Sequence, residues 1–377
     1  MSVLWAGIAV GLSWLGFAYA GYPLLLWLLA RLAPRRGEPQ GTSEPAPSLS
    51  VIVAVHNGGT VLEQKLEDTL ALAYPRPFEI IVTSDGSTDA TEEIAERFAD
   101  RGVLLVRNAQ REGKEAAQAR AIAVAKGDVL VFTDVTAEVE RDALSWIARR
   151  FSDPTIGCVS SEDHVAVEGG EGAYVRYEMA LRRLESEAAT IVGCSGSFFS
   201  VRRELAAPWP SDLASDFRSA LEAARRGLRA VSEPRARASF RAVDDPRAEW
   251  RRKVRTVRRG IAVLAAYRAL LHPRYGRTAL ALWGHKVARF TSPFALGLVF
   301  AASALAAPGS APAAALLGAQ LLLYGLGGLA LAVESVRSRS FVARVAGFFM
   351  LVNASMLVAW MHHLRGDKAV TWEPTRR

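Results

Sequence analysis

The chain has 377 residues, of which half are hydrophobic, and a net charge of +8. A single soluble core explains this combination poorly, whereas a polar domain joined to membrane spans explains it well. The basic residues lie mostly beside apolar segments, so anionic lipid is a simpler partner than nucleic acid. The two cysteines, Cys158 and Cys194, exclude a disulfide framework and show no metal-ligand spacing, which fits a reducing, cytoplasmic location for the polar part.

The first element is an apolar run over residues 3–32 that carries no charge before Arg31. It is too long for the apolar part of a cleavable signal, and no small-residue cleavage site precedes its basic flank. Residues 1–33 are therefore predicted to form a retained transmembrane helix. Residues 34–47 are rich in Pro, Gly and charge, and they are predicted to be a linker that leaves the membrane.

Between residues 48 and 245, short β-branched runs alternate with helical stretches. This pattern predicts an α/β domain with a mostly parallel sheet and helices on both faces. Such sheets bind ligands at the carboxyl ends of their strands, so the residues after each strand are the candidates for a site. We expect strands over 50–55, 78–83, 103–106 and 129–133, and helices over 60–72, 90–99, 114–125, 172–190 and 213–226.

Residues 246–290 are predicted to form a basic and amphipathic segment at the membrane interface. Its first part holds seven arginines and lysines within 246–259, and its second part, 280–290, carries His285, Lys286 and Arg289. Residues 291–365 contain the C-terminal membrane segments, and residues 366–377 form a tail. We expect apolar segments over roughly 293–307, 313–333 and 345–361.

The charge bias predicts how the chain is oriented in the cell membrane. Arg31, Arg35 and Arg36 follow the first span, which places the amino terminus outside and the large domain in the cytoplasm of a multi-pass protein. The side of the carboxyl terminus stays open. A fourth full crossing would put Arg365 and other basic residues outside, and the segment 345–361 is short enough to be re-entrant or tilted.

Two acidic residues follow predicted strands. Asp85 lies in the stretch 84–89 (SDGSTD) after the second strand, and Asp134 lies in 133–136 (TDVT) after the fourth. Taken alone, each aspartate is also typical of a turn or a helix cap, which would need no ligand. Two carboxylates at one edge of one sheet favour a ligand site, because carboxylate oxygens hold divalent cations against a diphosphate.

Four motifs occur in the order and spacing of family 2 glycosyltransferases, which are inverting enzymes with a GT-A fold. The resemblance covers roughly residues 49–259, and the flanking membrane segments match the membrane-bound branch of the family. It implies a nucleoside-diphosphate sugar donor, Mg²⁺ or Mn²⁺ as cofactor, and a lipid, lipid-linked or polysaccharide acceptor. The motifs are SVIVAVHNG (50–58), EIIVTSDGSTDAT (79–91), GKEAAQARAIAVAK (113–126) and VLVFTDVT (129–136).

Carried over by position, the resemblance implies a donor site that includes a metal ion. Asp134 holds the first acidic position of the family's Asp-x-Asp motif, and Thr136 replaces the second with a neutral oxygen. Gly58 stands where the first motif usually has Glu. The implied donor-binding residues are Ala54, His56 and Asp85 for the base and ribose, Lys114 near the phosphates, and Asp134 for the metal and diphosphate.

The resemblance implies that Asp216, in the stretch 213–217 (LASDF), is the catalytic base, although the family usually has an acidic pair here. An inverting transfer needs a carboxylate opposite the leaving diphosphate to take the acceptor's hydroxyl proton. The alternative is an aspartate favoured by the dipole in a helix's first turn. Arg255 matches the Arg of the Gln-x-x-Arg-Trp motif and would stabilise the leaving group, or it would belong to a lipid-facing helix.

Gly193, Ser195 and Gly196 lie in a stretch that the resemblance places near the acceptor, although a tight loop packed on the sheet explains it equally well. Cys194 is expected to be a small packed residue, since it lacks a histidine partner. A degenerate, non-catalytic scaffold or sensor is the alternative function, favoured by Thr136 and Gly58. A nicotinamide oxidoreductase ranks low because the first strand is not followed by GxGxxG.

Overall fold

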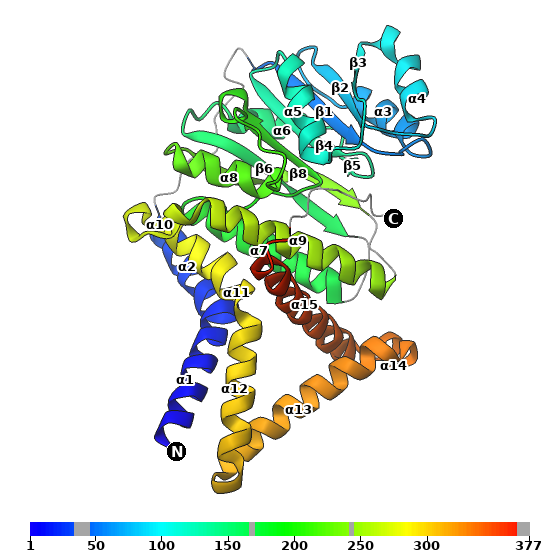
Figure 1. The fold of residues 1–377 in the computed structure, drawn as a ribbon. Helices are drawn as coiled ribbons and strands as arrows, with labels where there is room; N and C mark the ends of the chain where they lie inside the picture. Colours follow the sequence, from blue (N-terminus) through cyan, green and yellow to red (C-terminus); the bar gives the residue numbers. More distant parts are fainter. Residues whose placement is uncertain (34–45, 166–169, 241–244, 368–377) are drawn as a thin grey trace.

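The computed structural model describes residues 1–33, 46–165, 170–240 and 245–367. It consists of a domain built on one sheet and a group of apolar helices beneath it (Figure 1). Most of the predicted linker, residues 34–45, and the tail from residue 368 onward lie outside the described residues.

The sheet has eight strands in the order β3-β2-β1-β4-β7-β6-β8-β5. The pairs within β3-β2-β1-β4 are parallel, as is β6 with β8, whereas β7 is antiparallel to both its neighbours and β5 to β8. The predicted mostly parallel sheet is therefore mixed, and its second half was not divided into strands from the sequence. The strands are β1 (Leu49–Val55), β2 (Glu79–Asp85), β3 (Val103–Asn108), β4 (Val129–Asp134), β5 (Glu138–Val139), β6 (Ile156–Val165), β7 (Phe198–Arg202) and β8 (Arg229–Phe240).

Helices cover both faces of this sheet, because alternate strand residues point to opposite sides. Ile52 and Phe132 pack with α5 and α8 on one face, whereas Val51 and Val53 pack on the face covered by α3, α4 and α6. The helices of the domain are α3 (Leu62–Leu70), α4 (Thr91–Arg97), α5 (Lys114–Val124), α6 (Ala143–Arg150), α7 (Gly170–Ala188), α8 (Ser215–Arg225) and α9 (Pro246–Ala266). Short 3₁₀ helices lie at Ala99–Arg101, Arg203–Leu205, Arg268–Leu271, Pro273–Tyr275 and Ala307–Gly309.

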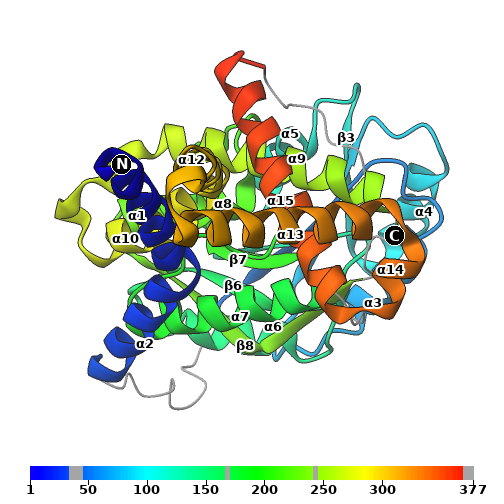
Figure 2. The ribbon, with the colours of Figure 1, turned by 90° about the horizontal axis from the view of Figure 1, so that it is seen from below.

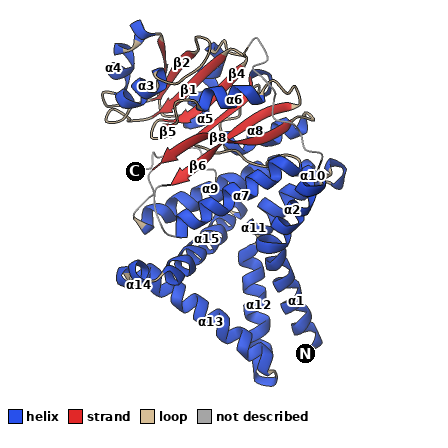
Figure 3. Cartoon of the chain, turned by 180° about the vertical axis from the view of Figure 1, so that it is seen from behind, coloured by secondary structure: helices blue, strands red, loops and turns tan. Residues whose placement is uncertain are grey.

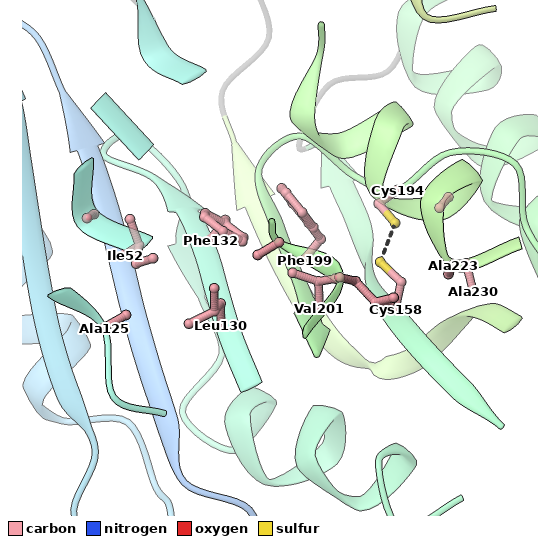
Figure 4. Packing of buried hydrophobic residues seen from close by; sticks show 14 of the residues in the cluster. Ile52, Ala125, Leu130, Phe132, Cys158, Cys194, Phe199, Val201, Ala223 and Ala230 are labelled. Carbon is pink, nitrogen blue, oxygen red and sulfur yellow. Dashed lines mark hydrogen bonds between the residues drawn. The ribbon is translucent and has the colours of Figure 1, made fainter. Parts of the chain in front are cut away.

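The core beneath α8 contains both cysteines (Figure 4). Phe132 and Phe199 stack with ring centroids 5.0 Å apart, which joins β4 to the antiparallel strand β7. Beside them the sulfur atoms of Cys158 and Cys194 lie 3.3 Å apart as free, buried thiols. The expectation that Cys194 is a packed residue agrees with this environment.

Within the described residues, four helices are long and apolar enough to cross a membrane: Ser2–Leu32, Ser292–Gly309, Ala311–Ala332 and Phe341–Leu364. The first consists of α1 (Ser2–Gly16), a π-helical turn (Phe17–Gly21) and α2 (Tyr22–Leu32). The others contain α12 (Ser292–Ala306), α13 (Ala311–Ala332) and α15 (Phe341–Leu364), with the short α14 (Glu334–Arg339) before α15. The predicted apolar segments are thus helical.

The helices α7 and α9 lie between the sheet and the apolar helices (Figure 3). Tyr22 and Leu26 of α2 pack against α7, and α15 packs against both α7 and α9. Seen from below, α13 runs from the end of α12 across to α14 (Figure 2). Arg258 Nε donates to Asp367 O (3.2 Å), so the last described residues lie on the domain side.

Candidate active site

The carboxyl edge of the sheet begins with Asp85 at the end of β2. Its buried carboxylate accepts hydrogen bonds from Asn108 Nδ2 (3.1 Å), Glu112 N (2.8 Å) and Gly113 N (2.9 Å). These bonds hold the loop that leads from β3 into α5. Gly86 has φ +61°, and a Cβ there would lie 2.7 Å from Arg111 N, so the turn after Asp85 requires glycine.

Ala54 of β1 and His56, in the turn after this strand, flank this edge. His56 Nδ1 lies 2.7 Å from the backbone oxygen of Asp85. Ala54 is the register partner of Thr83 on β2 and of Asp134 on β4. The structure therefore brings the three residues predicted for base and ribose to one edge, beside Asp134.

Asp134 ends β4 and pairs with the lysine that begins α5. Lys114 Nζ lies 2.5 Å from Asp134 Oδ1 and 3.4 Å from the backbone oxygen of Gly196. Burial lowers the pKa of Lys114, but the carboxylates of Asp134, Glu115 and Asp216 together raise the pKa above its ordinary value. The lysine is therefore a permanent positive charge at the end of the sheet.

A second buried lysine, Lys65, supports the turn after β4. No motif or pattern in the sequence pointed to this residue. Lys65 Nζ of α3 donates to Thr133 Oγ1 (2.9 Å) and to Ala137 O (2.6 Å). Burial lowers the pKa of Lys65 to about 8, although the nearby Asp134 carboxylate raises it. This contact fixes the turn that carries Asp134 and Thr136.

Asp216 lies in the first turn of α8, across a glycine-containing loop from Asp134. A Cβ added to Gly196 would lie 3.0 Å from Asp216 Oδ2, so the loop passes directly beside the carboxylate. The same loop contacts Asp134, whose backbone N–H donates to Ser197 O (3.0 Å). The loop 193–197 thus separates the two acidic residues.

Both carboxylates line one cavity of about 380 Å³. It extends from the sheet edge between α7 and α9 to Val352 and Met356 on α15. Seven of the residues predicted for the site line it: Lys114, Asp134, Thr136, Gly193, Gly196, Asp216 and Arg255. Ala54, His56 and Asp85 lie outside this lining, and Ser195 is 1% exposed, with its hydroxyl turned to donate to Asp163 Oδ1 (2.5 Å).

One buried carboxylate that the sequence did not identify joins three parts of the site. Glu115, next to Lys114 on α5, forms an ion pair with Arg259 of α9. Its Oε1 also lies 3.4 Å from both the backbone nitrogen and the hydroxyl of Ser215, which precedes Asp216. Burial lowers the pKa of Arg259, but Glu115, with Asp216 and Asp134, raises the pKa above its ordinary value. The only sequence signal for Glu115 was an acidic residue in a helix's first turn.

The basic residues of 280–290, which we expected at the lipid interface, are buried against α7 instead. The ring of His285 is 1% exposed, and its nitrogens lie 2.8 Å from Glu185 Oε1 and 2.7 Å from Glu178 Oε1. Arg289 Nη1 donates to Glu178 Oε2 (2.7 Å). These side chains are therefore covered by α7, which supplies carboxylates that pair with them. The interfacial location of the segment stays a prediction.

The donor set around Asp134 fits a divalent cation with few protein ligands. No group of three or more His, Cys, Asp or Glu side chains comes together among the described residues. Asp134 offers a carboxylate and Thr136 a hydroxyl at the cavity wall. Mg²⁺ in nucleotide sites is commonly held by one or two carboxylates together with phosphate oxygens, and this pattern needs no larger cluster.

Comparison with known proteins places the domain in a wider context. Residues 50–207 match the model of the family described as "Glycosyl transferase family 2". A mannosyltransferase from Pyrobaculum calidifontis, solved in complex with GDP-Man and Mn²⁺, superposes with a TM-score of 0.72 at 25% identity, covering 96% of this chain and all of that one (100%). The predicted GT-A fold with apolar helices at both ends is thereby confirmed.

Two curated relatives match at lower coverage. Beta-monoglucosyldiacylglycerol synthase of Synechocystis sp. is 26% identical over 200 residues, which are 49% of this chain and 41% of that protein. Poly-beta-1,6-N-acetyl-D-glucosamine synthase of Staphylococcus aureus is 24% identical over 228 residues, 57% of this chain and 55% of that protein. The chain therefore spans about half the length of these relatives.

Proposed function

We propose that this chain, which carries a family 2 glycosyltransferase domain over residues 50–207, transfers a sugar from a nucleoside-diphosphate sugar to a membrane acceptor by inverting displacement. The observation that carries the proposal is that Asp134 and Asp216 line one cavity and that the loop 193–197 contacts both residues. An inverting transfer requires this arrangement, with the leaving group held on one side and a base facing it on the other.

At the donor end, Ala54, His56 and Asp85 bind the base and ribose beside the phosphates. Asp134 and Thr136 hold Mg²⁺ or Mn²⁺, and the mannosyltransferase solved with GDP-Man and Mn²⁺ supports this assignment. The bound cation supplies charge neutralisation of the diphosphate. Lys114, already positive and buried beside Asp134, contributes a second charge to the same phosphates.

At the opposite side, Asp216 accepts the proton of the attacking hydroxyl. Gly196 lies beside the Asp216 carboxylate, and Ser197 O accepts a hydrogen bond from Asp134 N. The sugar's reacting carbon lies between the two carboxylates. Arg255 lines the cavity and stabilises the departing diphosphate through charge-assisted hydrogen bonds. Gly193 and Gly196 form the wall along which the acceptor approaches, with Ser195 buried behind it.

The acceptor enters from the membrane. The cavity reaches Val352 and Met356 on α15, one of the helices long enough to span a bilayer. The names of the relatives, a glycolipid synthase and a polysaccharide synthase, support a lipid, lipid-linked or glycan acceptor. With basic residues after the first span, and residue 367 on the domain side, the domain over 48–245 lies in the cytoplasm of a multi-pass cell-membrane protein.

A screen of labelled nucleotide-sugars against membranes that contain the protein tests this proposal. We expect one donor to label a product, which is then extracted into solvent or water to separate glycolipid from polysaccharide. Binding of a donor without turnover, across several acceptors and metals, would support the alternative of a non-catalytic scaffold. That alternative is favoured by Thr136 at the second acidic position and by the ion pair that already occupies Asp134.

A further inference from the structure

The half of the cavity nearest the membrane contains buried cations that the transfer reaction itself does not use. Lys286, before α11 (Ala288–Phe290), and Arg182 of α7 both line the cavity. The same cavity is lined by Asp216 at the sheet edge and by Val352 and Met356 on α15. A ligand that reached from the membrane to the base would pass both of them.

Lys286 points at the loop that faces the base. Its Nζ lies 3.5 Å from the position of a Cβ on Gly193 and 5.2 Å from the ring centroid of Phe217, the residue after Asp216. Its nearest carboxylate oxygen is Glu178 Oε1 at 4.0 Å. Burial lowers the pKa of Lys286, and the positive charges of Arg182 and Arg289 lower it further, although Glu178 raises it. An added negative charge would relieve this repulsion.

Arg182 is 8% exposed and makes fewer hydrogen bonds than a guanidinium can. Nη2 donates to Cys194 O (3.4 Å), whereas Nε and Nη1 have no hydrogen-bond partner within the described part of the chain. Glu178 Oε1 and Asp163 Oδ2 lie 3.8 Å and 4.0 Å away, beyond hydrogen-bond distance. Buried donors without acceptors are rare in proteins and indicate a missing partner.

The carboxylates around α7 are already engaged by other groups. Glu178 accepts from both His285 and Arg289, and Glu185 from His285 and Tyr22. Oδ1 of Asp163 accepts from the hydroxyls of Ser195 and Ser197. These carboxylates thus already have partners, and Lys286 Nζ also lies 3.3 Å from His285 Nε2.

We propose that Arg182 and Lys286 bind a phosphoryl group of the acceptor lipid, which lies between the acyl or prenyl tail on α15 and the hydroxyl that faces Asp216. This inference rests on the proposed function and narrows its acceptor to a phosphate-bearing lipid. A phosphoryl oxygen accepts the open N–H groups of Arg182 and the ammonium of Lys286 in charge-assisted hydrogen bonds. A neutral lipid of the same shape would leave Nε and Nη1 of Arg182 buried without a hydrogen-bond acceptor, which is costly.

The test uses the full chain in phosphatidylcholine nanodiscs with two probe lipids that share the same tails, phosphatidic acid and diacylglycerol. Native mass spectrometry measures which probe the protein retains. We expect phosphatidic acid to be retained about tenfold more strongly than diacylglycerol, and Lys286→Met or Arg182→Gln to remove that preference. Lys286→Arg keeps the charge and should restore it. Arg251→Gln, an exposed residue of α9 outside the cavity lining, is the matched control and should change nothing.

If the unaltered protein retained the two probes equally, the inference would be overturned, whatever the variants showed. An unchanged preference in both Lys286→Met and Arg182→Gln would also overturn it. Displacement of phosphatidic acid by an equal concentration of inorganic phosphate would show a site for free phosphate and contradict the lipid assignment. Binding of nucleotide-sugars by the unaltered protein is measured in the same nanodiscs. If the unaltered protein bound no nucleotide-sugar, that result would count against the proposed function and not against the phosphoryl site.

Discussion

Lys114 and Asp134 form an ion pair, with Nζ and Oδ1 2.5 Å apart, at the point where the first residue of α5 meets the last residue of β4. Their side chains are largely buried, at 11% and 29% exposure. The pair joins the two motifs that surround the diphosphate, and Lys114 reaches the loop beside Asp216 through Gly196 O. The donor side and the base side of the cavity are therefore tied together before any ligand binds.

Replacing Lys114 by Met should lower kcat/KM about a hundredfold, because one of the positive charges that stabilise the leaving diphosphate is lost. The same change frees Asp134 Oδ1, so Mn²⁺ should bind more tightly in the absence of donor. Steady-state kinetics and a Mn²⁺ titration measure the two effects. An unchanged kcat/KM in the variant would show that Lys114 only neutralises the charge of Asp134 and does not stabilise the leaving diphosphate.

Gly196→Ala should lower kcat about tenfold with little change in the KM for donor. The added Cβ would lie 3.0 Å from Asp216 Oδ2, and the carboxylate must shift by a few tenths of an ångström. Displacements of this size are sufficient to disturb a reacting geometry. Gly297→Ala in α12 is the control, since its new methyl meets no atom within 4 Å. Equal kcat in both variants would contradict the placement of the base.

Glu115→Gln should lower the free energy of unfolding by about 1–3 kcal/mol, because Arg259 loses the charge of its buried partner. It should also lower kcat, since Glu115 contacts Ser215 at the start of the helix that carries Asp216. Chemical denaturation and kinetics measure these effects. Glu112→Gln removes an exposed pair with Arg120 on the same stretch and should have little effect. A similar loss in both variants would argue against the connecting role of Glu115.

The two thiols should resist alkylation in the folded protein at neutral pH. Burial raises the pKa of Cys158 well above the usual 9.0, with a further contribution from its contact with Cys194. The unfolded thiol ionises at lower pH than the folded one, so this group's contribution to stability is complete below pH 9 and declines above it. Maleimide labelling with and without denaturant checks the first point, and unfolding at several alkaline pH values checks the second. Rapid labelling of the native protein would refute both.

The sequence predicted the first four strands and the long apolar helices because those signals are local. β1 is an uninterrupted buried run, and the four apolar segments carry almost no charge. Asp134 was identified from its position at a strand end, whereas Lys114 and Asp216 were identified from the resemblance to family 2 glycosyltransferases. All three residues lie at one cavity. Their chemical roles remain predictions.

The remaining features depend on contacts between distant segments. Lys286 and Arg289 have the pattern of an interfacial helix, and only the fold reveals that α7 covers them with Glu178. Glu115 was hidden within a motif because its partner, Arg259, lies 144 positions further on, the difference between the two residue numbers. Strands β6, β7 and β8 pair across long separations and have no simple alternation that marks their register.

The most direct test of the central claim is a comparison of donor binding and sugar transfer in Asp216→Asn. The amide keeps the shape of the side chain but cannot accept the hydroxyl proton. We expect nucleotide-sugar affinity to stay close to that of the unaltered protein while transfer falls at least about a hundredfold. Asp212→Asn, an exposed aspartate upstream of α8, should leave both unchanged. Transfer by Asp216→Asn at the unaltered rate would contradict the assignment of Asp216 as the base.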